Sequence, residues 1–398
     1  MVIWQRPAWP NFAWSPQALL PGLSSARLRQ GRLLGELEAT GFDLQQEAEL
    51  ATSIIDVVTT SAIEGETLAP ESVRSSVAHR LGLARAGLKD RRVDAIVDVV
   101  LDATRNASRP LTRQRLLGWH ATLFPSGRSN FQRIAVGRYR DSGSDPMQVV
   151  SGVLSKHPVV HFEAPPAKRL PIEVKALLGW LRGPGRQLDG LIASGLAHLW
   201  FVTIHPFDDG NGRLARALAD LVLARADGLT PRFWSMSAQI ERERADYYQQ
   251  LEQTQRGGLE VTGWLEWFIG CFERSVTLSF STLWRVRTKS AFWGALASLP
   301  PFSERQQKML RKILEQDEWT VTVKQWAAVC RCSIDSAQRD IAELVTRRVL
   351  ARNEGGSLRT SYRFSWAPTE VLAPLWPRNG NQRCRGFADT RMRSRILR

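Results

Sequence analysis

The chain has 398 residues, and this length alone suggests two or three domains. Hydrophobic residues make up 43% of it and charged residues 23%, a balance that is typical of globular proteins and excludes a disordered or fibrous chain. The net charge of +15 raises the expectation of a polyanionic partner such as nucleic acid, although an arginine-rich surface without such a partner gives the same charge.

Neither a membrane segment nor an export signal stands out. No run approaches the roughly 18 consecutive apolar residues of a membrane helix, and the N-terminal "MVIWQRPAWPNF" lacks the continuous apolar run of a signal peptide. We therefore expect a cytoplasmic protein without a membrane partner. Few cysteines in a long chain fit a reducing compartment. None has the C-x-x-C spacing of a zinc site, so free thiols are expected at Cys271, Cys330, Cys332 and Cys384.

An N-terminal helical domain is expected over residues 1–95. Residues 24–40 carry leucines at helical spacing after two serines that suit a helix start, and Gly41 is expected to end that helix. Residues 47–65 have the same periodicity. Two further helices are expected in residues 68–83, after Pro70, and in residues 92–106.

The stretch "TTSAIEGE" places a carboxylate at an unfavourable end of a helix. Gly65 suits the position that follows a helix C-terminus, which puts Glu64 in the last turn. This end of a helix carries partial negative charge, so a glutamate there needs a cation opposite it. The sequence therefore raises the question of which cation Glu64 meets.

The region from residue 96 to 285 is expected to be a helical core with one β-hairpin. Strand signals are scarce, except in residues 139–166, where two short β-branched runs flank glycine, serine and proline. Helices are expected to resume after it and to continue to about residue 285. The chain is thus predicted to be mainly α.

A second domain is predicted over residues 286–366. A Pro-Pro break precedes Ser303 and Gln306, whose spacing forms a capping box. A helix, a tight turn, a helix with Ser333 as its N-cap, and two short strands around Gly355-Gly356 then follow, in the order of a winged helix-turn-helix. Residues 367–398, rich in arginine and proline, are expected to be a disordered basic tail.

DNA is one candidate partner of this second domain. Its last helix would present Asp335, Gln338, Arg339, Arg347 and Arg348, with Arg352 and Arg359 near the wing. Such arginines contact DNA phosphates without distinguishing one base sequence from another. Asp335, Asp340 and Glu343 dilute the basic character of this helix. Winged helices also mediate protein contacts or dimerisation, so a homodimer is the alternative.

The segment "HPFDDGNGRLAR" carries the chemistry of the chain. It joins two apolar helical stretches, so it is predicted to be a loop that opens a helix. Backbone N–H groups of Gly210, Asn211 and Gly212 at a helix N-terminus can face an anion. Arg213 and Arg216, three residues apart, share a helical face and can both reach phosphate oxygens.

Two further side chains complete a phosphate-handling set. Asp209 offers an oxygen ligand suited to Mg²⁺ bridging substrate phosphates. His205 can take a proton from an attacking hydroxyl near neutral pH. Together these residues indicate in-line attack of a hydroxyl on a magnesium-bound nucleotide phosphate.

This string resembles the signature of the Fic family, His-x-Phe-x-(Asp/Glu)-Gly-Asn-Gly-Arg-x-x-Arg, at all eight defining positions. The resemblance implies AMP transfer from ATP to a Ser, Thr or Tyr hydroxyl of a target protein, with His205 as base and Asp209 holding Mg²⁺. It also implies that the nucleotide is bound by Phe207, Asp209, Gly210, Asn211, Gly212, Arg213 and Arg216.

Segments outside this signature also resemble the family. The predicted hairpin is similar to the Fic flap, which pairs with the target peptide by strand addition, and the candidate target contacts are Val150, Ser151 and Gly152. A surface hairpin is the alternative. The segment "RADYYQQLEQTQRGG" resembles the helix on the adenosine side, so Tyr247 and Tyr248 are candidate nucleotide contacts, with ordinary packing as the alternative. The N-terminal segment resembles a domain of unknown function that precedes some bacterial Fic cores.

Fic proteins with a Ser/Thr-x-x-x-Glu-Gly/Asn element resemble this chain at Thr60, Glu64 and Gly65. The resemblance implies that Glu64 pairs with Arg216 and inhibits transfer by misaligning ATP. Two other readings stay open. The chain could be a DNA-binding regulator whose Fic core senses nucleotide, or an enzyme that removes AMP with a water positioned by the glutamate.

Overall fold

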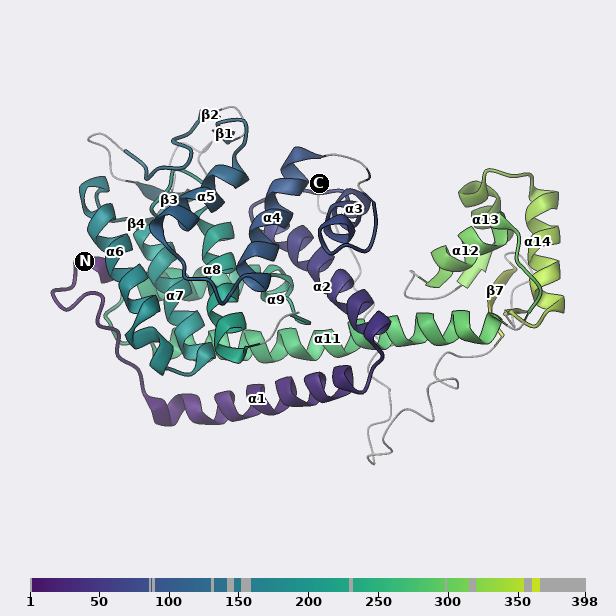
Figure 1. The fold of residues 1–398 in the computed structure, drawn as a ribbon, viewed down its shortest axis with the longest axis horizontal. Helices are drawn as coiled ribbons and strands as arrows, with labels where there is room; N and C mark the ends of the chain where they lie inside the picture. Colours follow the sequence, from purple (N-terminus) through teal and green to yellow (C-terminus); the bar gives the residue numbers. More distant parts are fainter. Residues whose placement is uncertain are drawn as a thin grey trace. The chain divides into compact units, whose positions relative to one another are not determined.

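The structure is a computed structural model that describes residues 2–85, 87, 90–129, 132–141, 147–151, 159–228, 232–297, 299–314, 320–353 and 360–365. The chain divides into two compact units, Met1–Val286 and Arg287–Arg398. Helices dominate both units, and the strands form small sheets, so the predicted mainly α fold is confirmed (Figure 1).

Helices build most of the first unit. They are α1 (Pro16–Glu38), α2 (Phe42–Ile63), α3 (Pro70–Arg80), α4 (Arg91–Arg105), α5 (Arg113–Leu123), α6 (Leu170–Arg182), α7 (Gly190–Ile204), α8 (Asn211–Asp227), α9 (Met236–Arg242), α10 (Arg244–Arg256) and α11 (Thr262–Leu296), with short 3₁₀ turns at Ile3–Gln5, Ala167–Arg169 and Pro184–Gln187.

The centre of this unit is the α7–α8 pair. Every residue of α7 is buried, which fits its nearly continuous apolar sequence. The Asp189 carboxylate caps its start by accepting a hydrogen bond from the Leu191 N–H at 2.8 Å. Helix α8 packs against α7; α2, α4 and α9 contact α8, and α6 contacts α7 (Figure 1). The loop between α7 and α8 therefore projects from the best-packed part of the fold.

Helix α1 starts earlier than the sequence predicts. Ser15 is its N-cap, with its Oγ accepting from the Ala18 N–H at 3.3 Å, and the helix continues through Pro21. The two serines that were expected to start the helix lie inside it. Helix α1 lies along α11 (Figure 1), and Ser25 donates a hydrogen bond to Glu273 of α11 at 2.7 Å. The early start is explained by Pro16 in the first turn, where proline is favoured.

Helix α2 is anchored to the core by a buried ion network. Asp56 is 1% exposed and accepts hydrogen bonds from Arg232 Nη2 at 2.6 Å and Ser235 Oγ at 2.5 Å. Arg232 also pairs with Asp220 of α8. A buried charge is costly unless it is paired, so these contacts define where α2 sits. The C-terminal end of α2 is thereby held beside the start of α8.

Two hairpins flank the α7–α8 loop. Strands β1 (Arg128–Ser129) and β2 (Gln132–Arg133) form the first. Strands β3 (Gln148–Ser151) and β4 (Val159–Glu163) form the second, with a register shift between Val149 and Val150. The hairpin predicted within residues 139–166 is thus confirmed.

The described part of the second unit holds the end of α11, three further helices and a three-stranded sheet of order β5-β7-β6. Its elements are α12 (Glu304–Leu314), β5 (Thr320–Thr322), α13 (Val323–Cys330), α14 (Ile334–Thr346), β6 (Leu350–Arg352) and β7 (Ser361–Phe364). The capping box of Ser303 and Gln306 is confirmed by hydrogen bonds of 2.9 and 3.3 Å. Ser333 caps α14, with its Oγ accepting from the Ser336 N–H at 3.2 Å. Residues 354–359, which include Arg359, lie outside the described residues.

Two side chains of α14 differ from the sequence expectation. Asp340 does not dilute a basic surface, because it is 6% exposed and accepts from Trp326 Nε1 at 3.2 Å and Arg305 Nε at 2.9 Å. Arg347, at the end of the helix, donates to the Pro300 carbonyl at 3.1 Å and stands over the Phe302 ring. Arg339 and Gln338 are exposed as expected.

Within the described ranges, no helix is both long and apolar enough to cross a bilayer. Cys271, Cys330 and Cys332 are free thiols, as the sequence predicts, and Cys384 lies outside the described residues.

Candidate active site

His205 ends α7 in a strained backbone conformation. Its φ of 49° and ψ of 60° lie in the left-handed region, which non-glycine residues rarely adopt and which is often found at functional sites. Arg140 stabilises this turn, since its Nε donates to the His205 carbonyl at 2.7 Å and its backbone N–H to the Pro206 carbonyl at 3.0 Å. The imidazole therefore lies at a defined point just beyond the buried helix.

The hydrogen bonding of His205 selects one tautomer. Nδ1 lies 3.3 Å from the Val202 carbonyl, which can only accept, so Nδ1 carries the proton and Nε2 is free to take one. Burial lowers the pKa of His205 to about 4, and the Arg140 charge acts in the same direction. The Val202 carbonyl and the Glu64 and Asp209 carboxylates oppose this shift without outweighing it. The ring is therefore neutral and basic at physiological pH.

Phe207 and Asn211 give the loop its shape. Phe207 is fully buried, and its ring stacks on that of His120 with centroids 4.0 Å apart. The Asn211 side chain accepts from the Phe207 N–H at 3.0 Å and donates to the Phe207 carbonyl at 2.8 Å. Both side chains therefore organise the loop from within. Nucleotide contact by Phe207 is expected from the family resemblance alone, whereas for Asn211 its backbone N–H at the helix N-terminus also predicts contact with an anion.

Glycines are required at the start of α8. Gly210 has a φ of +81°, and a Cβ there would come within 2.9 Å of the Phe124 ring. A Cβ on Gly212 would lie 2.3 Å from Glu64 Oε1. The Glu64 carboxylate thus occupies the space in front of the first turn of α8, where the unpaired N–H groups and dipole of a helix favour an anion.

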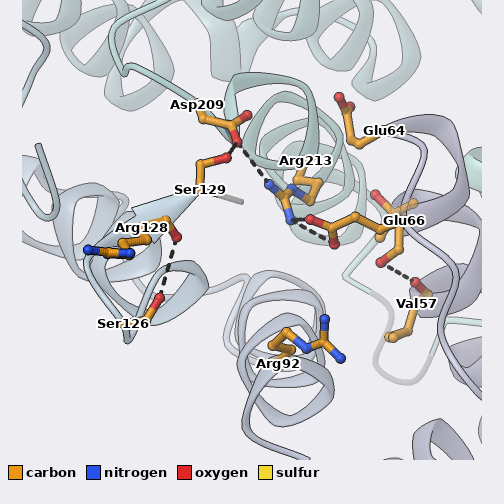
Figure 2. A network of polar contacts seen from close by, with 12 residues as sticks. Val57, Glu64, Glu66, Arg92, Ser126, Arg128, Ser129, Asp209 and Arg213 are labelled. Carbon is orange, nitrogen blue, oxygen red and sulfur yellow. Dashed lines mark hydrogen bonds and ion pairs between the residues drawn. The ribbon is translucent and has the colours of Figure 1, made fainter. Parts of the chain in front are cut away.

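Asp209 lies between a hairpin hydroxyl and an arginine (Figure 2). Ser129 of β1 donates to Asp209 Oδ2, the Gly210 N–H donates to Oδ1 at 2.5 Å, and Arg213 Nη2 is 3.8 Å from Oδ2. The side chain is 40% exposed. A solvent-accessible carboxylate with hydrogen bonds that fix its orientation is a suitable ligand for Mg²⁺.

Arg216 is buried and meets the end of α2. Its Nη2 donates to Glu64 Oε1 at 2.8 Å and to the Thr60 carbonyl at 2.9 Å, and its Nε donates to Thr60 Oγ1 at 2.9 Å. Burial acts to lower the pKa of this guanidinium, but the Glu64 carboxylate together with the Tyr247 and Tyr248 side chains outweighs it, so the pKa is raised. Arg216 is therefore the cation that Glu64 meets.

A second ion pair at this place was not anticipated from the sequence. Arg213 Nη1 lies 3.2 Å from both carboxylate oxygens of Glu66, as Figure 2 shows. Glu66 follows the helix-ending Gly65 by one residue. The sequence signal that could have indicated this second ion pair is therefore the acidic residue close to Glu64. Both arginines of the motif are thus paired with carboxylates from one turn.

That turn is a Schellman motif. The Gly65 N–H donates to the Ala62 carbonyl at 2.9 Å, the Glu66 N–H donates to the Ser61 carbonyl at 3.0 Å, and Gly65 has a φ of +81°. Gly65 therefore occupies the helix-ending position expected from the sequence. This turn directs the side chains on either side of Gly65 toward α8.

The two tyrosines differ in accessibility. Tyr247 is 2% exposed, and its hydroxyl lies 2.9 Å from His198 Nε2 inside the core. Tyr248 is 43% exposed, with the Arg244 guanidinium 5.8 Å from its ring centroid. Of the flap candidates, Val150 and Ser151 lie in β3, and Gly152 lies outside the described residues.

Comparison with known families agrees with this geometry. Residues 110–223 match the model of the Fic/DOC family, and residues 2–83 match a domain of unknown function, DUF4172. The chain therefore contains a Fic/DOC domain, and the helix that carries Glu64 belongs to the preceding region.

Curated relatives resemble parts of the chain. Protein adenylyltransferase Fic of Nematostella vectensis is 26% identical over 225 residues, which cover 54% of this chain and 46% of the relative. A probable protein adenylyltransferase of Aquifex aeolicus is 31% identical over 100 residues, which cover 25% of this chain and 28% of the relative. The chain thus spans less than half the length of these relatives.

A solved structure of a Fic family protein from Desulfovibrio desulfuricans has a similar fold. The TM-score is 0.52 and the identity 21%, over 89% of this chain and 98% of the other. At this level of identity the likeness concerns the fold, and it extends over both units.

Proposed function

We propose that this chain is a protein adenylyltransferase that transfers AMP from ATP to a Ser, Thr or Tyr hydroxyl of a target protein and of itself. The main support is the assembly of His205, Asp209 and Arg216 around the first turn of α8, with a carboxylate already in the anion position. Arg213 Nε and Arg216 Nη1 are buried without a hydrogen-bond partner among the described residues. A nucleotide phosphate fits these unused donors.

The reacting groups have distinct roles. His205 Nε2 takes the proton of the target hydroxyl as its oxygen attacks the α-phosphorus, the bond to the β-phosphate oxygen breaks, and pyrophosphate leaves. The two arginines and the N–H groups of α8 orient the phosphates. Asp209, held by Ser129, would bind Mg²⁺, which supplies charge neutralisation when present. The flap strand β3, with Val150 and Ser151, would align the target by strand addition, and Gly152, outside the described residues, is the third candidate contact.

Glu64 acts as an internal inhibitor in this proposal. While it holds Arg216 and fills the space before Gly212, ATP cannot place its phosphates productively. A positional error of about 1 Å can cost roughly 100-fold in rate. Glu66 adds to the inhibition by holding Arg213. Because both carboxylates come from one Schellman turn, a local movement of residues 64–66 would release both arginines without moving Asp56 from the core.

The test is self-modification by the Glu64→Gly variant with labelled ATP and Mg²⁺. The expected product carries one AMP group, which intact-protein mass spectrometry distinguishes from a phosphate. His205→Ala in the Glu64→Gly background should carry no label. If the variant instead releases AMP from a modified protein and transfers none, the AMP-removing activity is the correct function.

A second candidate function concerns the unit from Arg287 onwards. The order of α12, α13, α14 and the β5-β7-β6 sheet supports a winged helix-turn-helix, and Arg339 on α14 is exposed while Asp340 is turned into the core. DNA binding through α14 is therefore the second proposal. Electrophoretic mobility shifts with random duplex DNA would test it, and binding that survives His205→Ala would separate it from AMP transfer. Pairing of two chains is the competing outcome.

A further inference from the structure

A basic groove opens between α5 and α6, on the other side of Tyr139 from the motif loop. Its volume is about 440 Å³, within the usual range for ligand sites. The floor is apolar, with Leu111 and Leu178 buried, and the rim carries three exposed cations. The cations are Arg113, Lys175 and Arg182.

The charge of this groove is uncompensated. None of the eight lining residues is acidic, and none of the three cations forms an ion pair within the described part of the chain. Arg182 Nε donates to the Leu178 carbonyl at 3.1 Å, and the Arg113 guanidinium lies 5.4 Å from the Tyr139 ring centroid. Three like charges around one apolar floor attract an anionic ligand that also carries apolar groups.

The groove lies beside the motif loop, and one of its two helices follows the flap in the chain. Tyr139 lines the groove, and its ring centroid is 6.0 Å from that of Phe207. The next residue, Arg140, holds the His205 carbonyl. Strand β4 of the flap ends at Glu163 and leads within a few residues to α6, which supplies Lys175 and Arg182. The groove is thus connected to the motif loop through Tyr139 and to the flap through the start of α6.

We propose that this groove binds an acidic segment of the protein substrate and so contributes to the choice of target. The occupant cannot be the chain's own C-terminal tail, because that tail is arginine-rich. Duplex DNA does not fit either, since it needs phosphate contacts spread over a longer surface than one groove. The proposal rests on the proposed function in one respect: the bound acidic segment is taken to belong to a protein that receives AMP.

The test measures peptide binding without ATP. A fluorescein-labelled peptide of alternating glutamate and leucine is titrated with the full chain at low salt, followed by fluorescence anisotropy. The Arg113→Glu/Lys175→Glu variant should bind about tenfold more weakly or worse, because two attractions become repulsions. The control, Arg32→Glu/Lys312→Glu, makes the same change of charge at two exposed residues elsewhere and should bind within about twofold of wild type.

Three outcomes overturn the proposal. The affinity for the peptide could fall equally in the groove variant and in the control variant, or a glutamine–leucine peptide could bind as tightly as the glutamate–leucine peptide. Sodium triphosphate could also displace the peptide by binding in the groove itself. Circular dichroism melts confirm that the variants are folded. In the Glu64→Gly background, the groove variant should self-modify at an unchanged rate but label proteins of a cell lysate less strongly. Absence of all self-modification would refute the proposed function, whereas the anisotropy result would still decide whether the groove binds acidic peptides.

Discussion

The Glu64 carboxylate stands where a side chain on Gly212 would begin, with Oε1 only 2.3 Å from the position of a Cβ there. Glycine at this position therefore has two consequences. It lets the carboxylate that follows α2 approach the first turn of α8, and in the proposed function it leaves the same place open to a phosphate once that carboxylate moves away. The contact couples a residue of the N-terminal region to the anion site of the Fic/DOC domain.

Replacing Glu64 by glycine should raise the rate of self-modification by roughly 100-fold, the cost expected for about 1 Å of misplacement. Arg216 keeps its two hydrogen bonds to Thr60, so the variant should stay folded. The measurement is incorporation of labelled AMP with time. Glu38→Gly, which removes an exposed carboxylate at the end of α1, is the matched control and should behave as wild type. Equal rates for both variants would exclude inhibition by Glu64.

Glu66→Gln should have a smaller effect alone than Glu64→Gly, because the Glu66 side chain is 42% exposed and so holds the 5% exposed Arg213 from the solvent side only. In the Glu64→Gly background it should lower the KM for ATP by a few-fold, since an ion pair with one solvent-exposed partner contributes about 1 kcal/mol. Initial rates over a range of ATP concentrations measure this. An unchanged KM in the double variant would show that Arg213 is available despite its contact with Glu66.

The activity of Glu64→Gly should stay level with pH down to about pH 5 and fall only below it. Burial lowers the pKa of His205 to about 4, so the neutral, proton-accepting form persists well below the ordinary histidine value near 6.5. Loss of the Glu64 charge should lower this pKa further, because that carboxylate favours the protonated ring.

ATP itself titrates near pH 6–7, so the rate profile needs an independent measure of His205. Nuclear magnetic resonance titration supplies it, with the His205→Ala spectrum assigning the ring signal. A titration midpoint near 6.5 for this signal would contradict a base that stays neutral at physiological pH.

Asp56→Ala should destabilise the first unit by about 3–5 kcal/mol, because it breaks a buried ion pair and leaves Arg232 with one carboxylate fewer. Urea denaturation measures the change. Asp43→Ala, on the exposed first turn of the same helix, should cost no more than about 1 kcal/mol. A similarly small decrease in the free energy of unfolding for both variants would mean that Asp56 does not anchor α2.

Arg339→Ala should weaken binding to duplex DNA uniformly across sequences and reduce the slope of log affinity against log salt by about 1. Mobility shifts at several salt concentrations measure this slope. Arg32→Ala in the first unit removes one positive charge as well, so it serves as the control and should leave the slope unchanged. If wild type binds no DNA at low salt, the second unit has another partner.

Local patterns were sufficient for much of this protein. The left-handed Gly65, the capping box of Ser303 and Gln306, and the N-cap at Ser333 depend on contacts within a few residues, so the sequence predicts them directly. The start of α1 was misplaced because serines inside a helix look like caps, whereas Pro16 in the first turn identified the true start.

The sequence by itself determined the helical class, the loop that begins at His205 and opens a helix, and the presence of a glutamate at a helix end that needs a cation. Only the tertiary structure decided that Asp340 faces the core and that Glu66 meets Arg213. It also showed that Asn211 holds the loop from within. The reason is physical: periodicity and capping depend on neighbours in sequence, while the partner of a charge depends on which distant helix is packed beside it. Here that packing follows from Asp56, buried against Arg232.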